Sequence, residues 1–335
     1  MPTEAELARQ EGRDYEPADV LLERILGERR RKWEEARWAE LVERAKKKAA
    51  QAARKAAGLL SNLRDLEDAD WQDVEEDAYA PYLPKNDKWK AKYEEPAPPD
   101  IQGLPELPEG WVWVTLEQLA WRCNYGTSQK CTYEGGGPIV LRIPNIVQGN
   151  VVLEDIKRAT DAGMLSSADA CERGDMLIIR TNGSVDLIGR SALVTQTEPE
   201  GLYFASYLIR YTVLMAQEWV SAIWDSAFIR EQLQTTAASS AGQYNLSLGK
   251  LNSVVLPLPP LAEQERAVSE FQRQQSTVTQ IQQMILASVT RAHRLRQSIL
   301  KRAFEGRLVP QDRDAQAPTP LVDGAAALQE RLPGI

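Results

Sequence analysis

The chain has 335 residues, of which 43% are hydrophobic and 26% are charged, and its formal net charge is -8. No apolar run reaches the ~18 residues of a bilayer-spanning helix, and the N-terminus lacks the apolar segment of a signal peptide. We therefore expect a soluble, cytoplasmic protein with one or two cores and no membrane partner.

Residues 1–58 form the first predicted region, and most of it reads as one long helix over residues 17–58. Pro17 suits the first turn, and an apolar patch at residues 21–26 is followed by a narrow, Ala-rich stripe. We expect another helix to approach this stripe closely. The basic runs at 29–32 and 46–48 are interpreted as solvated helix faces, with phosphate contact as the alternative.

Residues 59–103 are predicted to be an acidic, proline-rich linker with little regular structure. Residues 59–80 carry one Arg against eight acids, and five prolines follow between positions 81 and 99. Such a composition resists helix continuation and favours an extended connector.

Residues 104–258 show short strands and turn signals typical of a mixed α+β domain. Strands are predicted at 111–114, 207–214 and 252–258, and Thr115 is a natural N-cap for a short helix. Two hairpins are predicted, around residues 148–150 and 182–184. Residues 218–234 read as a helix whose Trp219, Ile223 and Trp224 belong to the core, with a partner interface as the alternative.

Polar turns in this domain carry the chemistry that DNA recognition needs: flexible glycines, hydroxyls, amides and cations. The domain itself is acidic, with 11 Lys and Arg against 16 Asp and Glu, so we expect binding through local loop charges. Each turn taken alone also fits an ordinary polar turn. The candidate DNA-binding residues are Tyr125, Gly126, Thr127, Ser128, Lys130, Asn145, Arg180, Asn182, Gly183, Ser184, Ser240, Gln243, Tyr244 and Asn245.

Residues 259–305 are predicted to form a second long helix, which begins after Pro259 and Pro260 and stops near Gly306. Apolar side chains recur every seven residues, the spacing of a coiled-coil seam, and a helix of this length needs a partner. A plain structural strut is the alternative. The predicted seam comprises Phe271, Val278, Ile281, Ile285, Ala292, Leu295 and Ile299, and a tail over residues 306–335 follows.

Motifs of catalysis are missing from the sequence. The only histidine, His293, lies on the heptad helix, so no Ser-His or Cys-His arrangement can form within one chain. The three cysteines include no CxxC pair, and no phosphate-binding loop or adenine-methyltransferase motif occurs. The nearest nuclease-like pair, Asp155 with Lys157, fits a structural pair at a hairpin edge. We expect no catalytic residue, no metal site and no cofactor bound by this chain.

Several ordered motifs together resemble the specificity (S) subunits of type I restriction-modification enzymes. They are residues 104–111 (LPELPEGW), 115–119 (TLEQL), 245–251 (NLSLGKL), 257–264 (PLPPLAEQ) and 299–310 (ILKRAFEGRLVP). The resemblance implies a noncatalytic subunit that chooses the DNA sequence. It implies a target-recognition domain flanked by two long helices that form an antiparallel coiled-coil spacer. The implied partners are double-stranded DNA, methyltransferase (M) subunits, which carry S-adenosylmethionine, and a restriction (R) subunit.

The chain departs from the family pattern because it contains one recognition domain where two are usual. Residues 16–25 (EPADVLLERI) resemble the segment that comes after the first recognition half of a full subunit, so the chain resembles its C-terminal half. It is either a half-subunit that forms a homodimer through its long helices or a fragment. A functional alternative is a structural or regulatory half-subunit that occupies M-subunit docking sites without directing modification. An enzyme in its own right is a third, more distant interpretation.

Overall fold

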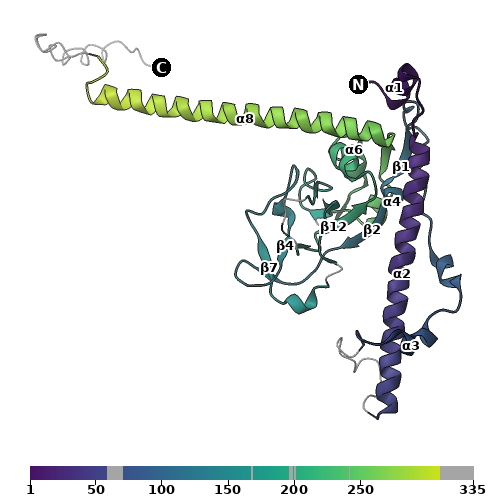
Figure 1. The fold of residues 1–335 in the computed structure, drawn as a ribbon. Coiled ribbons are helices and arrows are strands. Elements are labelled where there is room, and N and C mark those ends of the chain that lie inside the picture. The colour runs from purple at the N-terminus through teal and green to yellow at the C-terminus, as the bar shows by residue number, and fades with distance from the viewer. Residues whose placement is uncertain (59–70, 167–168, 196–198, 200, 241, 310–335) are drawn as a thin grey trace, which may run out of the picture. The chain divides into compact units, whose positions relative to one another are not determined.

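The computed structural model describes residues 1–58, 71–166, 169–195, 199, 201–240 and 242–309 (Figure 1). The chain divides into two compact units, Met1–Phe271 and Gln272–Ile335, and the last long helix passes from the first unit into the second. None of the helices in the described ranges combines the length and apolarity that crossing a bilayer requires.

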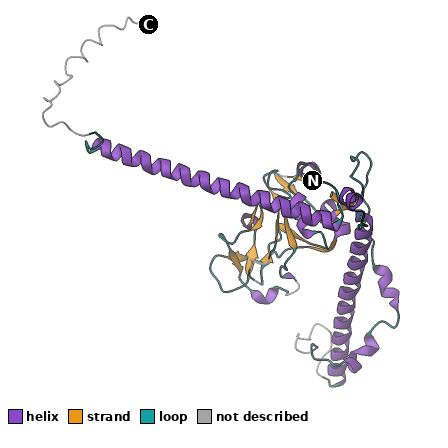
Figure 2. Cartoon of the chain, turned by 45° about the horizontal axis from the view of Figure 1, so that its top comes forward, coloured by secondary structure: helices purple, strands orange, loops and turns teal. Residues whose placement is uncertain are grey.

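Helices and strands alternate irregularly along the first unit (Figure 2). The α-helices are α1 (Glu4–Glu11), α2 (Ala18–Ala56), α3 (Glu76–Tyr79), α4 (Leu116–Leu119), α5 (Gln217–Ile223), α6 (Ala227–Thr236), α7 (Leu248–Asn252) and α8 (Leu261–Phe304). Short 3-10 helices are η3 (Ala80–Tyr82), η4 (Asp87–Lys92), η5 (Ile143–Asn145) and η6 (Ala162–Met164). The first strands are β1 (Val112–Thr115), β2 (Ala120–Tyr125), β3 (Cys131–Thr132), β4 (Ile139–Leu141), β5 (Ile146–Val147), β6 (Gly149–Val151) and β7 (Lys157–Ala159). The remaining strands are β8 (Asp175–Ile179), β9 (Thr181–Asn182), β10 (Ser191–Leu193), β11 (Tyr203–Phe204), β12 (Leu208–Val213), β13 (Ala238–Ser240), β14 (Gln243–Asn245) and β15 (Val255–Leu258).

The strands in the described ranges form four sheets. A six-stranded sheet has the order β2-β12-β8-β10-β6-β5, a four-stranded sheet β11-β4-β7-β3, and a three-stranded sheet β13-β14-β9, while β1 pairs with β15. With α2 and α8 on either side of this domain in the sequence, the structure confirms the predicted class: a mixed α/β domain flanked by two long helices. The pairing of those helices into an antiparallel spacer stays a prediction.

The first long helix, α2, confirms the prediction for residues 17–58, with Pro17 at its N-cap. Leu21 and Ile25 are completely buried in the core of the mixed domain, so the start of α2 is part of that domain's fold. The preceding helix α1 was not predicted, although Thr3 and Glu6 form a capping box that the sequence displays.

The segment that follows α2 differs from the predicted irregular linker. Residues 71–93, here called the aromatic strap, contain three short helical turns and lie along α2 (Figure 1). Trp89 stacks on Trp33 of α2 with ring centroids 6.3 Å apart, and the Tyr93 hydroxyl accepts a 2.7 Å hydrogen bond from Arg29. Aromatic side chains far apart in sequence therefore replace the expected extended connector with a docked segment. Residues 59–70 lie outside the described part.

The strap covers part of the Ala-rich stripe of α2, whereas Ala52 and Ala56 are exposed. Ala45 and Ala49 are 1% and 7% exposed, and α2 makes its contacts there with α3 and η3. The Lys47 ammonium lies 4.3 Å from the centroid of the Trp71 ring, and Lys46 donates to the Gln72 carbonyl over 2.9 Å. The close approach expected of another helix is thus made by the chain's own strap.

The predicted hairpins have different outcomes. Residues 148–150 do turn a hairpin, because β5 pairs with β6 in antiparallel register, although η5 interrupts the preceding strand. Around residues 182–184, β8 and β10 pair as expected, but the connection is not a tight turn. Its first residues form β9, which pairs with β14, and this unpredicted pairing brings two candidate DNA loops together.

The predicted helix over 218–234 is broken into α5 and α6. The break falls after Trp224, and Ser226 caps α6 by accepting a hydrogen bond from the Ile229 amide. Trp219 and Trp224 are 9% and 1% exposed, which confirms their assignment to the core.

An ion-pair cluster fastens α1 to the beginning of α8. Glu4 is 2% exposed, pairs with Arg13 over 2.6 Å and also pairs with Arg266. Its amide donates to Glu263, which also accepts a hydrogen bond from the Trp111 indole. Burial acts to raise the pKa of the Glu4 carboxyl, but the hydrogen bonds and charges of Arg266 and Arg13 outweigh burial and lower it.

The second unit consists of the rest of α8 and the residues that follow it, of which 310–335 lie outside the described part. The helix ends at Phe304, and Gly306 adopts φ 68°, as expected of a helix stop. Of the predicted seam, Phe271, Val278, Ile281, Ile285, Leu295 and Ile299 are between 41% and 60% exposed. Met284, Leu286 and Val289 are exposed as well, so α8 presents an uncovered apolar surface.

Candidate nucleic-acid interface

Two strand ends meet at one edge of the six-stranded sheet. Because β12 runs antiparallel to both β2 and β8, the last residues of those two strands flank its first residues. Tyr125 thereby lies opposite Ile209, and the Arg180 amide donates to the Tyr207 carbonyl over 2.9 Å. The sheet topology alone places Tyr125 and Arg180 on either side of one strand.

The side chains of Tyr125, Arg180 and Asn245, here called the Arg180 cluster, converge at this edge. The Arg180 guanidinium lies over the Tyr125 ring, 4.6 Å from its centroid. Arg180 also donates to the Asn245 side-chain oxygen over 3.1 Å, and Thr181 donates to the same oxygen over 3.3 Å. Because that oxygen is engaged as an acceptor, the amide NH2 of exposed Asn245 is left as a donor.

The chemistry of the Arg180 cluster suits nucleic acid. It offers a guanidinium fork, an amide donor and a ring that is 41% exposed, groups that meet phosphate oxygens, base edges or base faces. Within the part of the chain that the structure describes, no carboxylate pairs with Arg180, and its buried Nε has no hydrogen-bond partner. The positive charge is thus held in place without being neutralised.

Gly126 is required by close backbone packing beside the cluster. A Cβ at this position would lie 2.2 Å from the Phe204 carbonyl oxygen and 2.5 Å from that of Ala205. The Thr127 amide donates to the Phe204 carbonyl over 2.8 Å, and Thr127 forms an isolated parallel bridge with Ala205. This contact aligns the loop that carries Ser128 and Lys130, both of which are exposed.

Hydrogen bonds from α6 and from the end of α5 hold the loop between β9 and β10. Arg230, 8% exposed, donates to the Ile188 carbonyl over 2.7 Å, and burial lowers the pKa of its guanidinium. The Trp224 indole donates to the Gly189 carbonyl over 2.7 Å. These contacts hold the far end of the loop whose near end carries Asn182, Gly183 and Ser184.

A buried polar network reaches from the core to Tyr125. Arg210 and Asp175 are 1% and 0% exposed, and Arg210 donates to the Asn124 side-chain oxygen over 2.8 Å. Asn124 in turn donates to the Tyr125 carbonyl over 3.2 Å. Burial raises the pKa of the Asp175 carboxyl, although hydrogen bonds from the Glu172 amide and Thr212 and the nearby arginines act in the opposite direction. The network fixes the end of β2, and with it the ring under Arg180.

The structure divides the candidate DNA-binding residues by exposure and role. Tyr125, Ser128, Lys130, Gln243 and Asn245 are exposed, and the half-buried Arg180 joins Tyr125 and Asn245 in the cluster. Gly126, Thr127, Asn182, Gly183, Ser184 and Tyr244 shape the loops, and Ser240 is described only by its backbone in β13.

The structure corrects the prediction that Asn145 belongs to the DNA-binding surface. It is 0% exposed, accepts a hydrogen bond from the Arg142 amide, and donates to the Val152 and Asp155 carbonyls. Its donors and acceptor are engaged in fixing the chain before the β5–β6 hairpin, so it leaves the candidate set.

Two exposed tyrosines of the mixed domain are absent from the candidate DNA-binding residues. Tyr207, 55% exposed, supplies the carbonyl that accepts from the Arg180 amide. Tyr133, 66% exposed, lies with its ring centroid 4.6 Å from the Lys157 ammonium on β7. The sequence signal that identifies such tyrosines is an aromatic residue next to a polar or glycine-rich turn.

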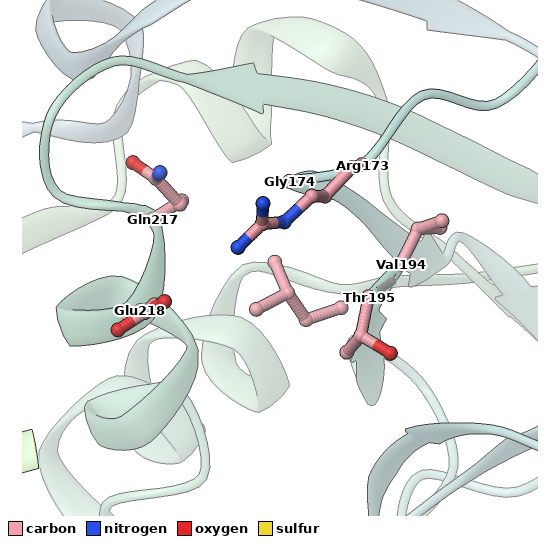
Figure 3. A pocket seen from close by; sticks show the side chains of 7 residues that line it. Arg173, Gly174, Val194, Thr195, Gln217 and Glu218 are labelled. Carbon is pink, nitrogen blue, oxygen red and sulfur yellow. The ribbon is translucent and has the colours of Figure 1, made fainter. Parts of the chain in front are cut away.

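A hollow of about 520 Å³ lies on another part of the domain, between the end of β10 and the start of α5. Figure 3 shows the Arg173 side chain extending into the space between Gln217 and Val194, with Glu218 on the α5 side. Its described lining combines opposite charges and aliphatic groups around a wide opening. It therefore defines no particular ligand.

Metal-ligating and nucleophilic side chains are dispersed. In the described ranges, no group of three or more His, Cys, Asp or Glu residues lies in a metal-binding arrangement. Burial raises the pKa of the Cys171 thiol to about 12, which keeps it protonated at neutral pH.

Fold and surface together define a mixed α/β domain that presents aromatic, amide and guanidinium groups where neighbouring strands end. No family model matches the chain. Over 224 residues it is 28% identical to the type I restriction enzyme EcoKI specificity subunit of Escherichia coli strain K12, covering 65% of this chain and 48% of that protein. It is 27% identical over 230 residues to the StySPI specificity subunit of Salmonella potsdam, covering 67% and 49%.

The chain is thus a relative of type I restriction enzyme specificity subunits, and it spans about half the length of the curated relatives it matches. Two solved structures are similar in part. The HsdS subunit from Thermoanaerobacter tengcongensis is 18% identical, with 65% of this chain and 54% of that chain covered and a TM-score of 0.46. A chain from a study of complex assembly and conformational transition in the type I R-M system is 20% identical, with 62% and 49% covered and a TM-score of 0.47.

Proposed function

We propose that this chain is a noncatalytic DNA-specificity subunit of a type I restriction-modification system, and that its mixed domain reads one half of a split target. The observation that carries the proposal is the Arg180 cluster. Three loops that the sequence marks as DNA-binding candidates meet there, on a relative of specificity subunits. The guanidinium, amide and aromatic groups act as recognition groups for bases and phosphates.

Partners follow from the same proposal. Double-stranded DNA is read by the mixed domain, and the uncovered apolar surface of α8 binds other subunits of the system: M subunits, an R subunit, or a second copy of this chain. S-adenosylmethionine chemistry belongs to the M subunit. In a homodimer, two recognition domains would face two halves of an inverted-repeat target.

A second function is favoured by one observation, the acidity of residues 104–258, with 11 basic against 16 acidic residues. In that case the chain occupies M-subunit docking sites without directing modification. Gel-shift assays of the chain together with M subunits, at a stated salt concentration, distinguish the two functions. Sequence-dependent retardation supports the specificity role, whereas assembly without DNA preference supports the regulatory one.

A further inference from the structure

The C-terminal half of α2 carries charge that its own helix does not neutralise. Earlier in α2, Arg31 pairs with Glu28 and Glu35 and Arg37 pairs with Glu40, while Arg24 pairs with Glu16 just before the helix. From residue 44 to residue 56 the sequence holds six basic residues and no Asp or Glu. The solvated ion-pair pattern expected of an exposed helix therefore ends at Glu43.

Three of these cations share one exposed face. At 100° per residue, Arg44, Lys48 and Lys55 lie within about 40° of one another around the helix. All three are exposed, and none forms an ion pair with another residue of the described part. Lys46 and Lys47, by contrast, are engaged: Lys46 donates to the Gln72 carbonyl of the strap, and Lys47 pairs with Glu43 over 2.7 Å and lies over the Trp71 ring.

Packing against the strap stabilises the C-terminal end of α2 as a helix. An Ala- and Lys-rich helix without a buried face is marginal in water. Because the strap covers Ala45 and Ala49, α2 continues to Ala56 and keeps Arg44, Lys48 and Lys55 in register.

A hollow lies farther toward the N-terminal end of the same helix. About 310 Å³ in volume, it is lined by Trp33, Ala36, Arg37 and Glu40 of α2 and by Lys92 at the end of η4. Lys92 is exposed, and the buried Nε of Arg37 has no hydrogen-bond partner within the described ranges. Glu40 in the same lining pairs with Arg37 over 2.7 Å, so this hollow adds little free positive charge to the face.

We propose that this face of α2 (Arg44, Lys48 and Lys55) binds the phosphate backbone of duplex DNA without reading its sequence. The inference rests on the proposed function, which brings duplex DNA to this chain, and it supplies the nonspecific attraction that the acidic mixed domain lacks. Along the axis the three cations are about 6 and 10 Å apart. Duplex DNA carries one negative charge per ~1.7 Å of its axis, so a row of cations of this length faces several phosphates.

The test is the salt dependence of binding between the full chain and a random-sequence duplex, from about 50 to 200 mM salt. The variant Arg44→Gln/Lys48→Gln/Lys55→Gln is expected to bind more weakly at low salt. Its slope of log affinity against log salt should be shallower by about 2.7, since each lost phosphate contact removes about 0.9.

The matched control is Arg9→Gln/Arg24→Gln/Arg31→Gln, which removes the same charge from exposed residues that already pair with carboxylates. It should change the slope by less than about one contact. An equal reduction in both variants, an unchanged slope in the first, or undetectable binding of the wild-type chain at low salt overturns the proposal. Circular dichroism verifies that α2 remains helical.

A second probe, polyglutamate, distinguishes DNA from an acidic protein surface as the occupant. Loss of polyglutamate binding with unchanged duplex binding in the first variant contradicts the proposal.

Sequence discrimination separates this inference from the proposed function: the α2 variant should keep the same methylated motif in cells that express M subunits. If wild-type motif selection fails while the salt slopes differ as expected, the reading function is wrong and the backbone contact stands.

Discussion

The guanidinium of Arg180 lies over the ring of Tyr125, 4.6 Å from its centroid, although the two residues are 55 positions apart in the chain. The pairing follows from β2 and β8 flanking the same strand, so it is built by the sheet rather than by a flexible loop. A cation held by a ring and an amide oxygen is already oriented before DNA arrives, which lowers the ordering cost of binding.

Replacing Arg180 by Ala is expected to weaken binding to the preferred DNA sequence by about 1–3 kcal/mol if it contacts a base. Arg180→Lys keeps the charge but loses the planar fork, so it should recover nonspecific affinity without recovering full discrimination. Competition between target and scrambled duplexes measures both effects. Equal discrimination by the wild-type chain and Arg180→Ala would remove Arg180 from the reading surface.

Gly126→Ala should destabilise the mixed domain by about 1–3 kcal/mol, because the new Cβ would overlap the Phe204 and Ala205 carbonyls. Gly136→Ala is the matched control, since a Cβ there meets no atom within 4 Å. Urea unfolding at a fixed pH compares the two variants. Equal midpoints would show that the 126–130 loop can shift at no cost, contrary to tight packing of Gly126 against the two carbonyls.

The sequence predicted those elements whose signals are local. The helix α2, the N-cap of Thr115, the β5–β6 hairpin and the stop at Gly306 each depend on residues within a few positions. The capping box of α1 is equally local and was overlooked. Local rules also favoured exposed turn residues as DNA contacts, and they fail for Asn145, where burial decides.

Features made by distant residues could not be predicted. The aromatic strap depends on Trp89 reaching Trp33, and its proline- and acid-rich composition points the other way. The Arg180 cluster depends on β9 pairing with β14, which no turn signal encodes. The coiled-coil seam on α8 is readable from its heptads, but a heptad pattern does not identify the helix that packs against it, and the seam stays a prediction.

Glu4→Gln is expected to lower the free energy of unfolding near neutral pH by about 1–3 kcal/mol, because Arg13 and Arg266 lose their carboxylate. The pKa of Glu4 is lowered from 4.5 in the folded chain, so its contribution is present above the ordinary value and is lost as the pH falls through the lowered pKa. Urea unfolding as a function of pH should therefore show wild type and variant converging below about pH 4.5. A constant difference through this range contradicts the assignment.

The double change Ile285→Asp and Ile299→Asp should abolish assembly through α8. Each change places an unpaired charge in an apolar contact, and burying that charge costs several kcal/mol. Gln283→Asp with Thr290→Asp adds the same charge on the opposite side of the helix and should leave assembly intact. Sedimentation velocity of the chain, alone and with M subunits, measures the outcome. Identical assembly of both double variants would refute the seam.

The most direct test of the central claim is a map of methylated adenines in cells that express M subunits with and without this chain. We predict one split motif that appears with the wild-type chain and is lost or altered with Arg180→Ala. Methylation that is the same in the presence and absence of the chain would contradict the proposal that it selects the DNA sequence.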